Sequence, residues 1–401
     1  MTGTATRSST YDVIVIGARC AGAAVALLLA RQGLKVLVVD RSRHGSDTLS
    51  THALMRGGVL QLQRWGILDA VQAAGTPSVS ATTFHYGEES VEIFIKPRDG
   101  VDALYAPRRT VIDPILADAA VGAGAEILRG PRVTDLIRPD GDRVRGVIVE
   151  DTPGHFQQIG ADMVIGADGV RSTVARLVNA PINREGRHAT GVVYGYWEGL
   201  DLEGYHWYYR PGVAAGSIAT NGGTLVFAAV SRERFWSEVR FDLPTGFFQV
   251  LREAAPEVVN AMSGARQLGG FRGFSGQPGF LRQCWGPGWA LVGDAGYFKD
   301  PITAHGMTDA PRDAELLARA VLAATRGALA GYQRVRDDLS VRLFEMTDIL
   351  AAFEWGFEDL QALHKELSDE MRQEVQYLVR LHDRQSAAAT NAEGNGLVRA
   401  S

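Results

Sequence analysis

Tyr11-Asp-Val-Ile-Val-Ile-Gly17-Ala-Arg-Cys-Ala-Gly22, continued as far as Asp40, is the stretch on which the interpretation of this chain depends. An apolar strand over 13–16 ends at Gly17, a small-residue helix follows over 21–31, and a second apolar strand over 36–39 ends at Asp40. This order predicts a βαβ unit whose helix N-terminus points free N–H groups at an anion. Gly17 permits the tight turn, Gly22 brings the helix close to the strand, and Asp40 is placed to bind ribose hydroxyls.

The phosphate-binding pattern departs from G-x-G-x-x-G at its middle position, where this chain has Arg19. The middle glycine normally lets the backbone approach a pyrophosphate. Two explanations remain open: the loop turns Arg19 away, or its guanidinium contacts the phosphates. A βαβ unit that binds no nucleotide also fits this stretch alone, so the remaining motifs must decide.

Composition sets outer limits on the function. The chain has 401 residues, 46% hydrophobic and 22% charged, which is ordinary for a globular protein of more than one domain. A formal net charge of -5 argues against nucleic acid as the main partner. The two cysteines form no disulfide or metal pattern. We expect no signal peptide, no integral membrane segment and a cytoplasmic location.

The middle of the chain changes from a βαβ pattern to an antiparallel one. The first part predicts a helix over 52–72, a hairpin over 80–96, a helix from 109 to 122 or 124, and strands over 125–128, 133–137, 144–150 and 163–166. Short aromatic-rich strands follow between 191 and 230, with a hairpin turn at Asn221-Gly222-Gly223. Alternation places Tyr194 and Tyr196 on one face. Helices are expected over 235–261, 308–326 and 341–381.

Three strands end in glycine or acidic motifs that are typical of ligand-binding loops. These motifs are Gly17 to Gly22, Asp168-Gly169 and Gly293-Asp294. Parallel strands of an α/β sheet end on the same side, so all three motifs are expected to face one ligand. A further helix beginning near Gly306 offers a second N-terminus for an anionic group.

With these motifs in this order, residues 10–335 resemble the FAD-dependent monooxygenase superfamily, whose best-known member is para-hydroxybenzoate hydroxylase. The superfamily also includes geranylgeranyl reductases and flavin halogenases. The resemblance implies an α/β fold, in which an FAD-binding Rossmann-like domain joins an antiparallel-sheet substrate domain and C-terminal helices. The domains are expected over 1–75, 100–180 and 281–335 for FAD, 76–99 and 181–280 for substrate, and 336–385 for the helices, with a disordered tail over 386–401.

The resemblance also implies a set of FAD contacts. Asp40 would bind the adenosine ribose, Asp294 the ribityl hydroxyls, and the N–H groups of Gly306 and Met307 the flavin pyrimidine edge. Asp168 and Gly169 match a motif implicated in both FAD and NADPH contact. The full expected set is Gly17, Arg19, Cys20, Ala21, Gly22, Asp40, Arg41, Arg109, Val133, Asp168, Gly169, Arg171, Gly293, Asp294, Gly306 and Met307.

Catalytic and substrate residues follow less directly from the pattern. Candidates for catalysis are His305, His52 and Tyr297, and candidates for substrate contact are Tyr194, Tyr196 and Tyr209. His305 is either an acid or base beside the flavin or a loop histidine bonded to backbone. Ala304 stands where the family usually has glycine. The halogenase Trp-x-Trp-x-Ile-Pro motif is absent from the sequence, which disfavours halogenation.

The resulting functional expectation is an FAD-dependent monooxygenase. NADPH or NADH would reduce FAD, and oxygen would be transferred through a flavin C4a-hydroperoxide to a mostly apolar, aromatic or polyene small molecule. The alternative is a hydride-transferring reductase of the geranylgeranyl reductase type; a non-catalytic FAD-fold protein is the third candidate. We expect a monomer or homodimer.

Overall fold

The opening βαβ unit is present in the computed structural model, which describes residues 5–6, 11–139, 141–200, 202–325 and 327–398. Strand β2 (Tyr11–Ile16), helix α1 (Cys20–Ala30) and strand β3 (Val36–Asp40) follow one another as expected. All of β3 is buried, and so is all of β2 except Asp12. Burial on both faces explains why these strands are apolar throughout instead of alternating.

The first sheet has nine strands, and its centre is parallel in the order β20-β11-β2-β3-β8. Antiparallel strands β10, β9 and β19 extend it, and β1 pairs with the start of β11. Helix α1 packs against α4 and α9. The additional elements are β1 (Ala5–Thr6), α4 (Arg109–Gly122), β8 (Glu126–Arg129), β9 (Arg132–Leu136), β10 (Gly146–Thr152), β11 (His155–Gly166), α5 (Thr173–Leu177), β19 (Trp285–Gly286) and β20 (Trp289–Leu291).

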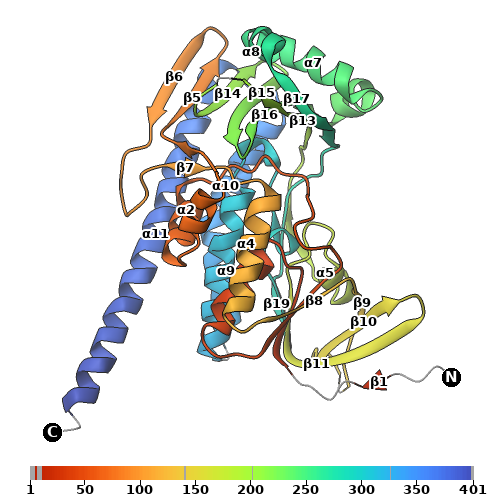
Figure 1. Cartoon of the computed structure of the whole chain (residues 1–401), viewed down its shortest axis with the longest axis vertical. Coiled ribbons are helices and arrows are strands. Elements are labelled where there is room, and N and C mark those ends of the chain that lie inside the picture. The colour runs from red at the N-terminus through yellow and green to blue at the C-terminus, as the bar shows by residue number, and fades with distance from the viewer. Residues whose placement is uncertain (1–4, 7–10, 140, 201, 326, 399–401) are drawn as a thin grey trace.

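The second sheet has seven strands in the order β17-β13-β16-β15-β14-β5-β6 and forms the upper end of the molecule in Figure 1. Its strands are β5 (Ala81–Tyr86), β6 (Glu89–Phe94), β13 (Thr190–Glu198), β14 (Tyr205–Arg210), β15 (Val213–Thr220), β16 (Gly223–Ser231) and β17 (Arg266–Phe274). The pairs from β17 to β14 are antiparallel, whereas β5 joins β14 in parallel. The hairpin expected over 80–96 therefore extends a sheet built mainly from a distant part of the chain.

The two faces of this second sheet are covered differently. Tyr194, Tyr196 and Tyr209 lie in one buried apolar cluster, together with residues of the C-terminal helices. Trp197 lies on the opposite face, where it stacks on Phe247 with ring centroids 5.3 Å apart. That face is covered by α7 (Leu243–Ala254) and α8 (Pro256–Ala261). The predicted same-face placement of Tyr194 and Tyr196 is confirmed.

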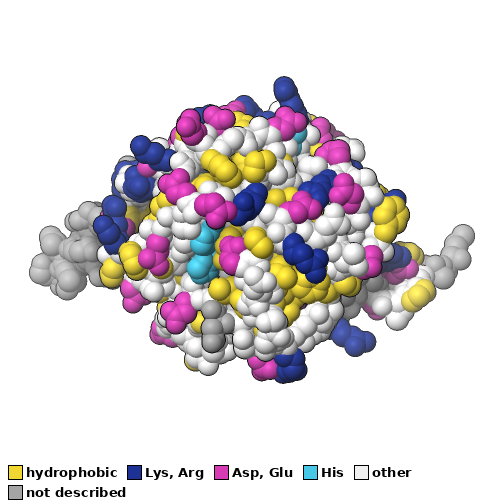
Figure 2. Space-filling view, turned by 90° about the horizontal axis from the view of Figure 1, so that it is seen from above, with side chains coloured by type: hydrophobic (Ala, Val, Ile, Leu, Met, Phe, Trp, Pro, Cys, Tyr) yellow, Lys and Arg dark blue, Asp and Glu magenta, His cyan; other side chains and the backbone are white. Residues whose placement is uncertain are grey.

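Three helices complete the chain: α9 (Gly306–Ala323), α10 (Ala328–Ala351) and α11 (Phe357–Val398). In Figure 1, α11 runs from the second sheet along the side of the molecule to the C-terminus, and it packs against α10 and α2. None of the helices in the described ranges is long and apolar enough to cross a membrane. On the face seen in Figure 2, acidic and basic side chains are interspersed among hydrophobic ones, and neither charge dominates.

The remaining elements are short. They are α2 (Arg56–Arg64), α3 (Leu68–Ala73), β4 (Ser78–Val79), β7 (Leu104–Tyr105), β12 (Ile182–Glu185), α6 (Arg232–Arg234), the π-helix η1 (Phe235–Val239), η2 (Met262–Gly264), β18 (Phe280–Arg282), η3 (Gly293–Ala295), β21 (Tyr297–Phe298) and η4 (Pro301–Thr303). Strands β12, β18 and β21 form a small third sheet, and β4 pairs with β7.

Several elements differ from the expectations above. The helix expected over 52–72 is two helices, α2 and α3, because Gly66 adopts a left-handed φ of 69° between them. Strand β17 was not expected, since its Gly269-Gly270 and Gly273 weaken the strand pattern. The strand expected over 163–166 is the end of the longer β11.

Helix α11 continues to Val398, through most of the stretch 386–401 that was expected to be disordered. The stretch contains Ala387-Ala388-Ala389, and alanine has the highest helix propensity. Residues 399–401 lie outside the described residues. The domain boundaries given above remain a prediction.

At two positions of the opening motif, the surrounding backbone leaves no room for a side chain. Gly17 has a φ of 104°, and a Cβ there would lie 2.6 Å from the carbonyl oxygen of Ala167. A Cβ on Gly22 would lie 1.9 Å from the carbonyl oxygen of Gly17. The predicted roles of Gly17 in the turn and of Gly22 in close helix packing are confirmed.

Replacing Gly22 by alanine is expected to destabilise the protein by about 1–3 kcal/mol, because α1 must move away from its preceding loop. Gly122→Ala is the matched control: it lies at the end of α4 with no neighbour within 4 Å of an added Cβ. That control should be neutral or gain up to about 1 kcal/mol. Urea unfolding measures both, and equal midpoints for Gly22→Ala and the wild type would contradict the close contact.

Candidate functional site

The three predicted ligand-binding loops leave one edge of the first sheet. Gly166, the last residue of β11, pairs with Ile16 at the end of β2 and with Leu291 at the end of β20. The N–H of Ala167 donates to Ile16 at 2.8 Å, and that of Val292 donates to Gly166 at 2.9 Å. The expectation that the motifs share one side of the sheet is therefore confirmed.

Arg19 occupies the N-cap position of α1 with extended backbone (φ -91°, ψ -173°), which any residue adopts. This conformation explains why the loop does not need a glycine there. The side chain is partly buried and lines a small hollow together with Asp40. Burial, and then repulsion by Arg109, lower the pKa of Arg19, while Asp113 and Asp40 oppose the shift. Arg19 therefore faces the expected phosphate and ribose side of the loop.

Asp40 and Asp113 order the backbone around this loop. Asp40 accepts hydrogen bonds from the N–H groups of Ala18 and Ser42, both at 2.6 Å. Asp113 accepts from the N–H of Cys20 at 3.2 Å and from its Sγ at 3.1 Å, and it pairs with Arg109 at 2.9 Å. Asp113 was not among the predicted site residues, although its i,i+4 spacing from Arg109 on α4 was a usable signal.

The Asp168-Gly169 motif has a structural role of its own. Asp168 accepts a hydrogen bond from Ser172 Oγ at 2.5 Å and one from the N–H of Thr173 at 2.6 Å, so it caps α5. Burial raises its pKa, and these hydrogen bonds oppose the shift. Arg171 is exposed at the same loop, and Val133 lies partly buried in β9. Their predicted cofactor contacts stay predictions.

Asp294 and the start of α9 present polar groups on the same side. Asp294 is exposed, while Gly293 and Ala295 beside it are buried. Desolvation of its carboxyl by the surrounding protein atoms raises the pKa of Asp294 to about 6 even though part of the residue is exposed, and Arg109 opposes this shift. Gly306 is exposed and Met307 is partly buried, and as the first helical residues they have N–H groups with no partner inside the helix.

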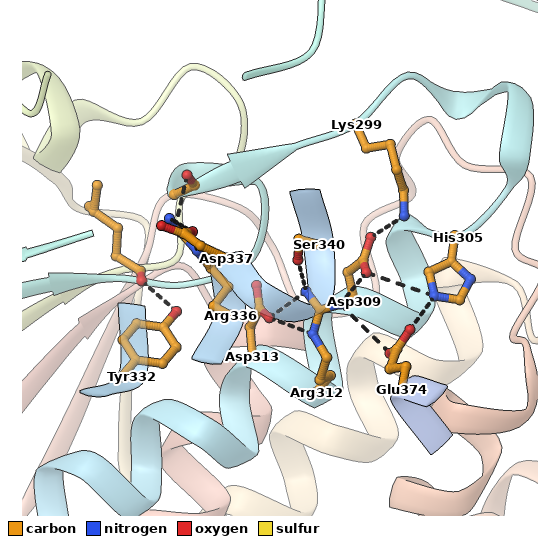
Figure 3. Close-up of polar contacts among 12 residues, drawn as sticks. Lys299, His305, Asp309, Arg312, Asp313, Tyr332, Arg336, Asp337, Ser340 and Glu374 are labelled. Atoms are coloured by element: carbon orange, nitrogen blue, oxygen red, sulfur yellow. Dashed lines mark hydrogen bonds and ion pairs between the residues drawn. The ribbon is translucent and has the colours of Figure 1, made fainter. Parts of the chain in front are cut away.

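His305 lies in a buried ionic cluster formed by Lys299, His305, Asp309, Arg312, Asp313 and Glu374 (Figure 3). His305 Nε2 lies 2.9 Å from Glu374 Oε2, on α11. Lys299 and Arg312 each lie 2.9 Å from Asp309. Burial opposes ionisation of Asp309, but these two cations outweigh it and lower its pKa to about 2. His305 is thus a buried histidine that contacts the Glu374 side chain and not a loop histidine bonded to backbone, and its catalytic role stays a prediction.

The same cluster resembles a metal site, because His305, Asp309 and Glu374 each offer a ligand atom within 4.8 Å of the others. Lys299 and Arg312 already lie 2.9 Å from Asp309, and Arg312 lies 3.7 Å from Glu374, so two cations occupy the surroundings of these carboxylates and we assign no metal here. Tyr297, the third catalytic candidate, is also buried, with its ring 5.8 Å from the Arg312 guanidinium carbon. Its burial favours a packing role, and its predicted catalytic role stays a prediction.

A second set of polar contacts lies on the face of β13 that carries Tyr194 and Tyr196. His52 Nε2 is 2.6 Å from the hydroxyl of Tyr196, and the N–H of Ser50 donates to the hydroxyl of Tyr194 at 3.2 Å. The guanidinium carbon of Arg108 lies 3.9 Å from the centre of the Tyr196 ring. The loop over 46–52, which is rich in serine and threonine, therefore packs on Tyr194 and Tyr196, both of which were predicted to contact substrate.

Tyr209 shares this face but has other neighbours. Its ring lies 4.8 Å from that of His364 and 5.8 Å from that of Trp355, both in the C-terminal part of the chain. It also stacks on Tyr86 with centroids 6.2 Å apart. Its predicted substrate contact stays a prediction, and the geometry favours a packing role.

The His52 environment makes a pH-dependent contribution to stability. Burial, and then the charges of Arg109, Arg108 and Arg272, lower the pKa of His52 from 6.5 to about 3. Because the folded state resists protonation, stability is fully present above the unfolded pKa and is lost as the pH falls toward 3.

Between about pH 6 and 4, the wild type should lose up to about 1.4 kcal/mol per pH unit more than His52→Asn. Asparagine cannot take the proton and tolerates the left-handed backbone of this position, where φ is 69°. His155→Asn, at an exposed histidine, is the control and should keep the wild-type slope. Urea unfolding across this range measures the slopes, and equal slopes for wild type and His52→Asn would refute the burial argument.

Comparisons with known proteins agree with this geometry. Residues 10–245 match the family model of the FAD binding domain. A menaquinone reductase of Mycolicibacterium smegmatis is 26% identical over 326 residues, which cover 74% of this chain and 72% of that protein. Digeranylgeranylglycerophospholipid reductase 1 of Methanococcoides burtonii is 26% identical over 354 residues, which cover 84% of this chain and 78% of that protein.

Solved structures share the fold. The flavin-dependent brominase Bmp2 has a TM-score of 0.76 at 20% identity, with 92% of this chain and 93% of that chain covered. PqsL, a probable FAD-dependent monooxygenase from Pseudomonas aeruginosa, has a TM-score of 0.73 at 21% identity, with 89% of this chain and 100% of that chain covered.

The residues at the sheet edge fit FAD. The N-termini of α1 and α9 offer N–H groups without a partner inside the helix, although that of Cys20 is bonded to Asp113. Arg19 and Arg109 offer positive charge, and exposed Asp294 offers an acceptor for hydroxyls. The matching family model covers more than half of the chain. This protein therefore belongs to the FAD binding domain family within the FAD-dependent monooxygenase superfamily, and it is an FAD-dependent oxidoreductase.

Proposed function

We propose that this flavoenzyme oxygenates a mostly apolar small molecule, aromatic or polyene, with NADPH or NADH as the reductant. The observation that carries the proposal is one continuous apolar cluster. Ile302 and Ala304, just before the flavin-facing start of α9, pack in the same cluster as Tyr194 and Tyr196. The face that would hold an apolar substrate thus adjoins the loop that would hold the reactive ring.

The protein's own groups have distinct roles in this proposal. Bound FAD would supply the redox chemistry and the reaction with oxygen. The N–H groups of Gly306 and Met307 would stabilise negative charge on the reduced pyrimidine ring. Burial raises the pKa of Tyr196, so its hydroxyl stays protonated beside His52. The buried aromatic face would exclude water and orient the substrate.

Hydride transfer without oxygen is the second candidate, and the two sequence relatives reported above favour it. Both are reductases by name, and they cover about three quarters or more of this chain. The same apolar cluster would accept a polyene chain equally well, so the geometry does not separate the two reactions.

Product analysis separates the two candidates. The FAD-loaded enzyme is supplied with NADPH, dioxygen labelled with heavy oxygen, and a panel of phenols and prenylated quinones. We expect a product that carries one labelled oxygen atom, because the proposed reaction inserts oxygen from dioxygen. A product that gains only two hydrogens, in air and without air alike, would contradict oxygenation and support the reductase.

The role of Arg19 is tested separately from turnover. If its guanidinium contacts the FAD phosphates, Arg19→Gly and Arg19→Gln should weaken FAD binding about ten- to a hundredfold, which corresponds to a lost charged hydrogen bond. Arg342→Gln removes an exposed arginine of α10 and should leave binding unchanged. Titration of the apoprotein with FAD gives the dissociation constants. Unchanged or tighter binding in Arg19→Gly would exclude the contact.

A further inference from the structure

Three arginines lie close enough to His52 to lower its pKa, and only two of them have an acidic partner among the described residues. Arg109 pairs with Asp113 at 2.9 Å, and Arg272 pairs with Asp47 at 2.8 Å. Arg108 has no carboxylate within ion-pair distance in the described part of the chain. Among the described residues, the guanidinium of Arg108 therefore has no direct ion-pair partner.

The Arg108 guanidinium is also short of hydrogen-bond acceptors. Its Nε and Nη2 atoms are buried, and neither has a hydrogen-bond partner in the described residues. The Tyr196 ring stacks on the guanidinium and stabilises its positive charge. The ring does not accept hydrogen bonds from the N–H groups, which point outward in the guanidinium plane. A buried donor without an acceptor destabilises the folded protein, because it has lost its hydrogen bonds to water. An acceptor supplied by a ligand would remove this cost.

A comparison with the neighbouring Arg109 indicates which ligand Arg108 would bind. Arg109 faces the phosphate loop, because its partner Asp113 also binds Cys20 at the start of α1. Arg108 faces the other way, toward Tyr196, and its own N–H is bonded at 3.0 Å to Asn221 in the turn between β15 and β16. Consecutive residues thus serve the two sides of the site, Arg109 the cofactor side and Arg108 the substrate side.

We propose that Arg108 is a specificity-determining residue, which binds an anionic oxygen, a carboxylate or ionised phenol, on the substrate. The proposal rests on the proposed function, since it names the substrate class of that same site. The planar fork of a guanidinium matches a carboxylate with two parallel hydrogen bonds. His52 Nδ1, buried and also without a hydrogen-bond partner in the described residues, adds a second polar atom beside Tyr196. The substrate is then apolar along its body and acidic at one end.

The test uses oxidised, FAD-loaded protein with no NADPH, so its outcome is independent of whether the enzyme oxygenates or reduces. Benzoate and its neutral analogue benzamide are the probes, and equilibrium dialysis or perturbation of the flavin spectrum measures their binding. The wild type should bind benzoate about ten- to a hundredfold more tightly than benzamide, as a charge-assisted pair predicts. No preference for benzoate in the wild type would overturn the proposal.

Arg108→Met keeps the length of the side chain and removes its charge, so the two probes should bind it equally. Arg108→Lys keeps the positive charge but lacks the planar guanidinium, so its preference for benzoate over benzamide should be smaller than that of the wild type. This variant also provides the test if Arg108→Met does not fold. Arg266→Met, an exposed arginine on β17 of the same sheet, is the control and should behave as the wild type.

The FAD affinity of the same variants tests whether the cofactor, instead of the substrate, supplies the anion that Arg108 binds. We expect FAD binding to be unchanged in Arg108→Met. A preference for benzoate that survives in Arg108→Met, while FAD binding weakens, would show that the cofactor is the partner of Arg108 and that the proposal is wrong.

Discussion

The site depends on one packing constraint, the close approach of helix α1 to the loop that precedes it. Gly22 has no room for a Cβ beside the Gly17 carbonyl, and Gly17 itself lies against the Ala167 carbonyl at the end of β11. Gly293, at the end of β20, in turn lies against Ala21. Three loops from distant parts of the chain are thereby held at the same sheet edge. A dinucleotide that spans this edge meets all of them at once, which explains why the motifs are informative together and weak singly.

The sequence predicted the features that depend on local pattern. Apolar strands ending in glycine, the alternation of Tyr194 and Tyr196, and the hairpin over 80–96 were all found. Strand β17 was missed because its glycines remove the pattern, and it forms only because β13 provides a partner strand. A pairing of this kind is set by the tertiary structure and leaves little trace in local composition.

The polar partners of the site were the least predictable part. Glu374 follows His305 by 69 positions, and nothing near either residue in the sequence indicates their contact. Asp113 binds Cys20 across 93 positions. From the sequence, His305 was expected in the loop beside the flavin, and in the structure it also belongs to a buried cluster shared with α11. Long-range ion pairs need the folded chain before they can be recognised, because each partner alone reads as an ordinary charged residue.

The buried ionic cluster around Asp309 connects helix α11 to the loop that precedes α9. Its fixed charges are two cations, Lys299 and Arg312, against three carboxylates in Figure 3. A buried excess of one negative charge is costly. Burial raises the pKa of Asp313, so a proton held on this carboxyl would remove the excess charge. Glu374, on α11, lies 2.9 Å from His305. His305 immediately precedes Gly306. Through the contact between His305 and Glu374, α11 therefore reaches the residue next to the first turn of α9, which would face the reduced flavin in the proposed function.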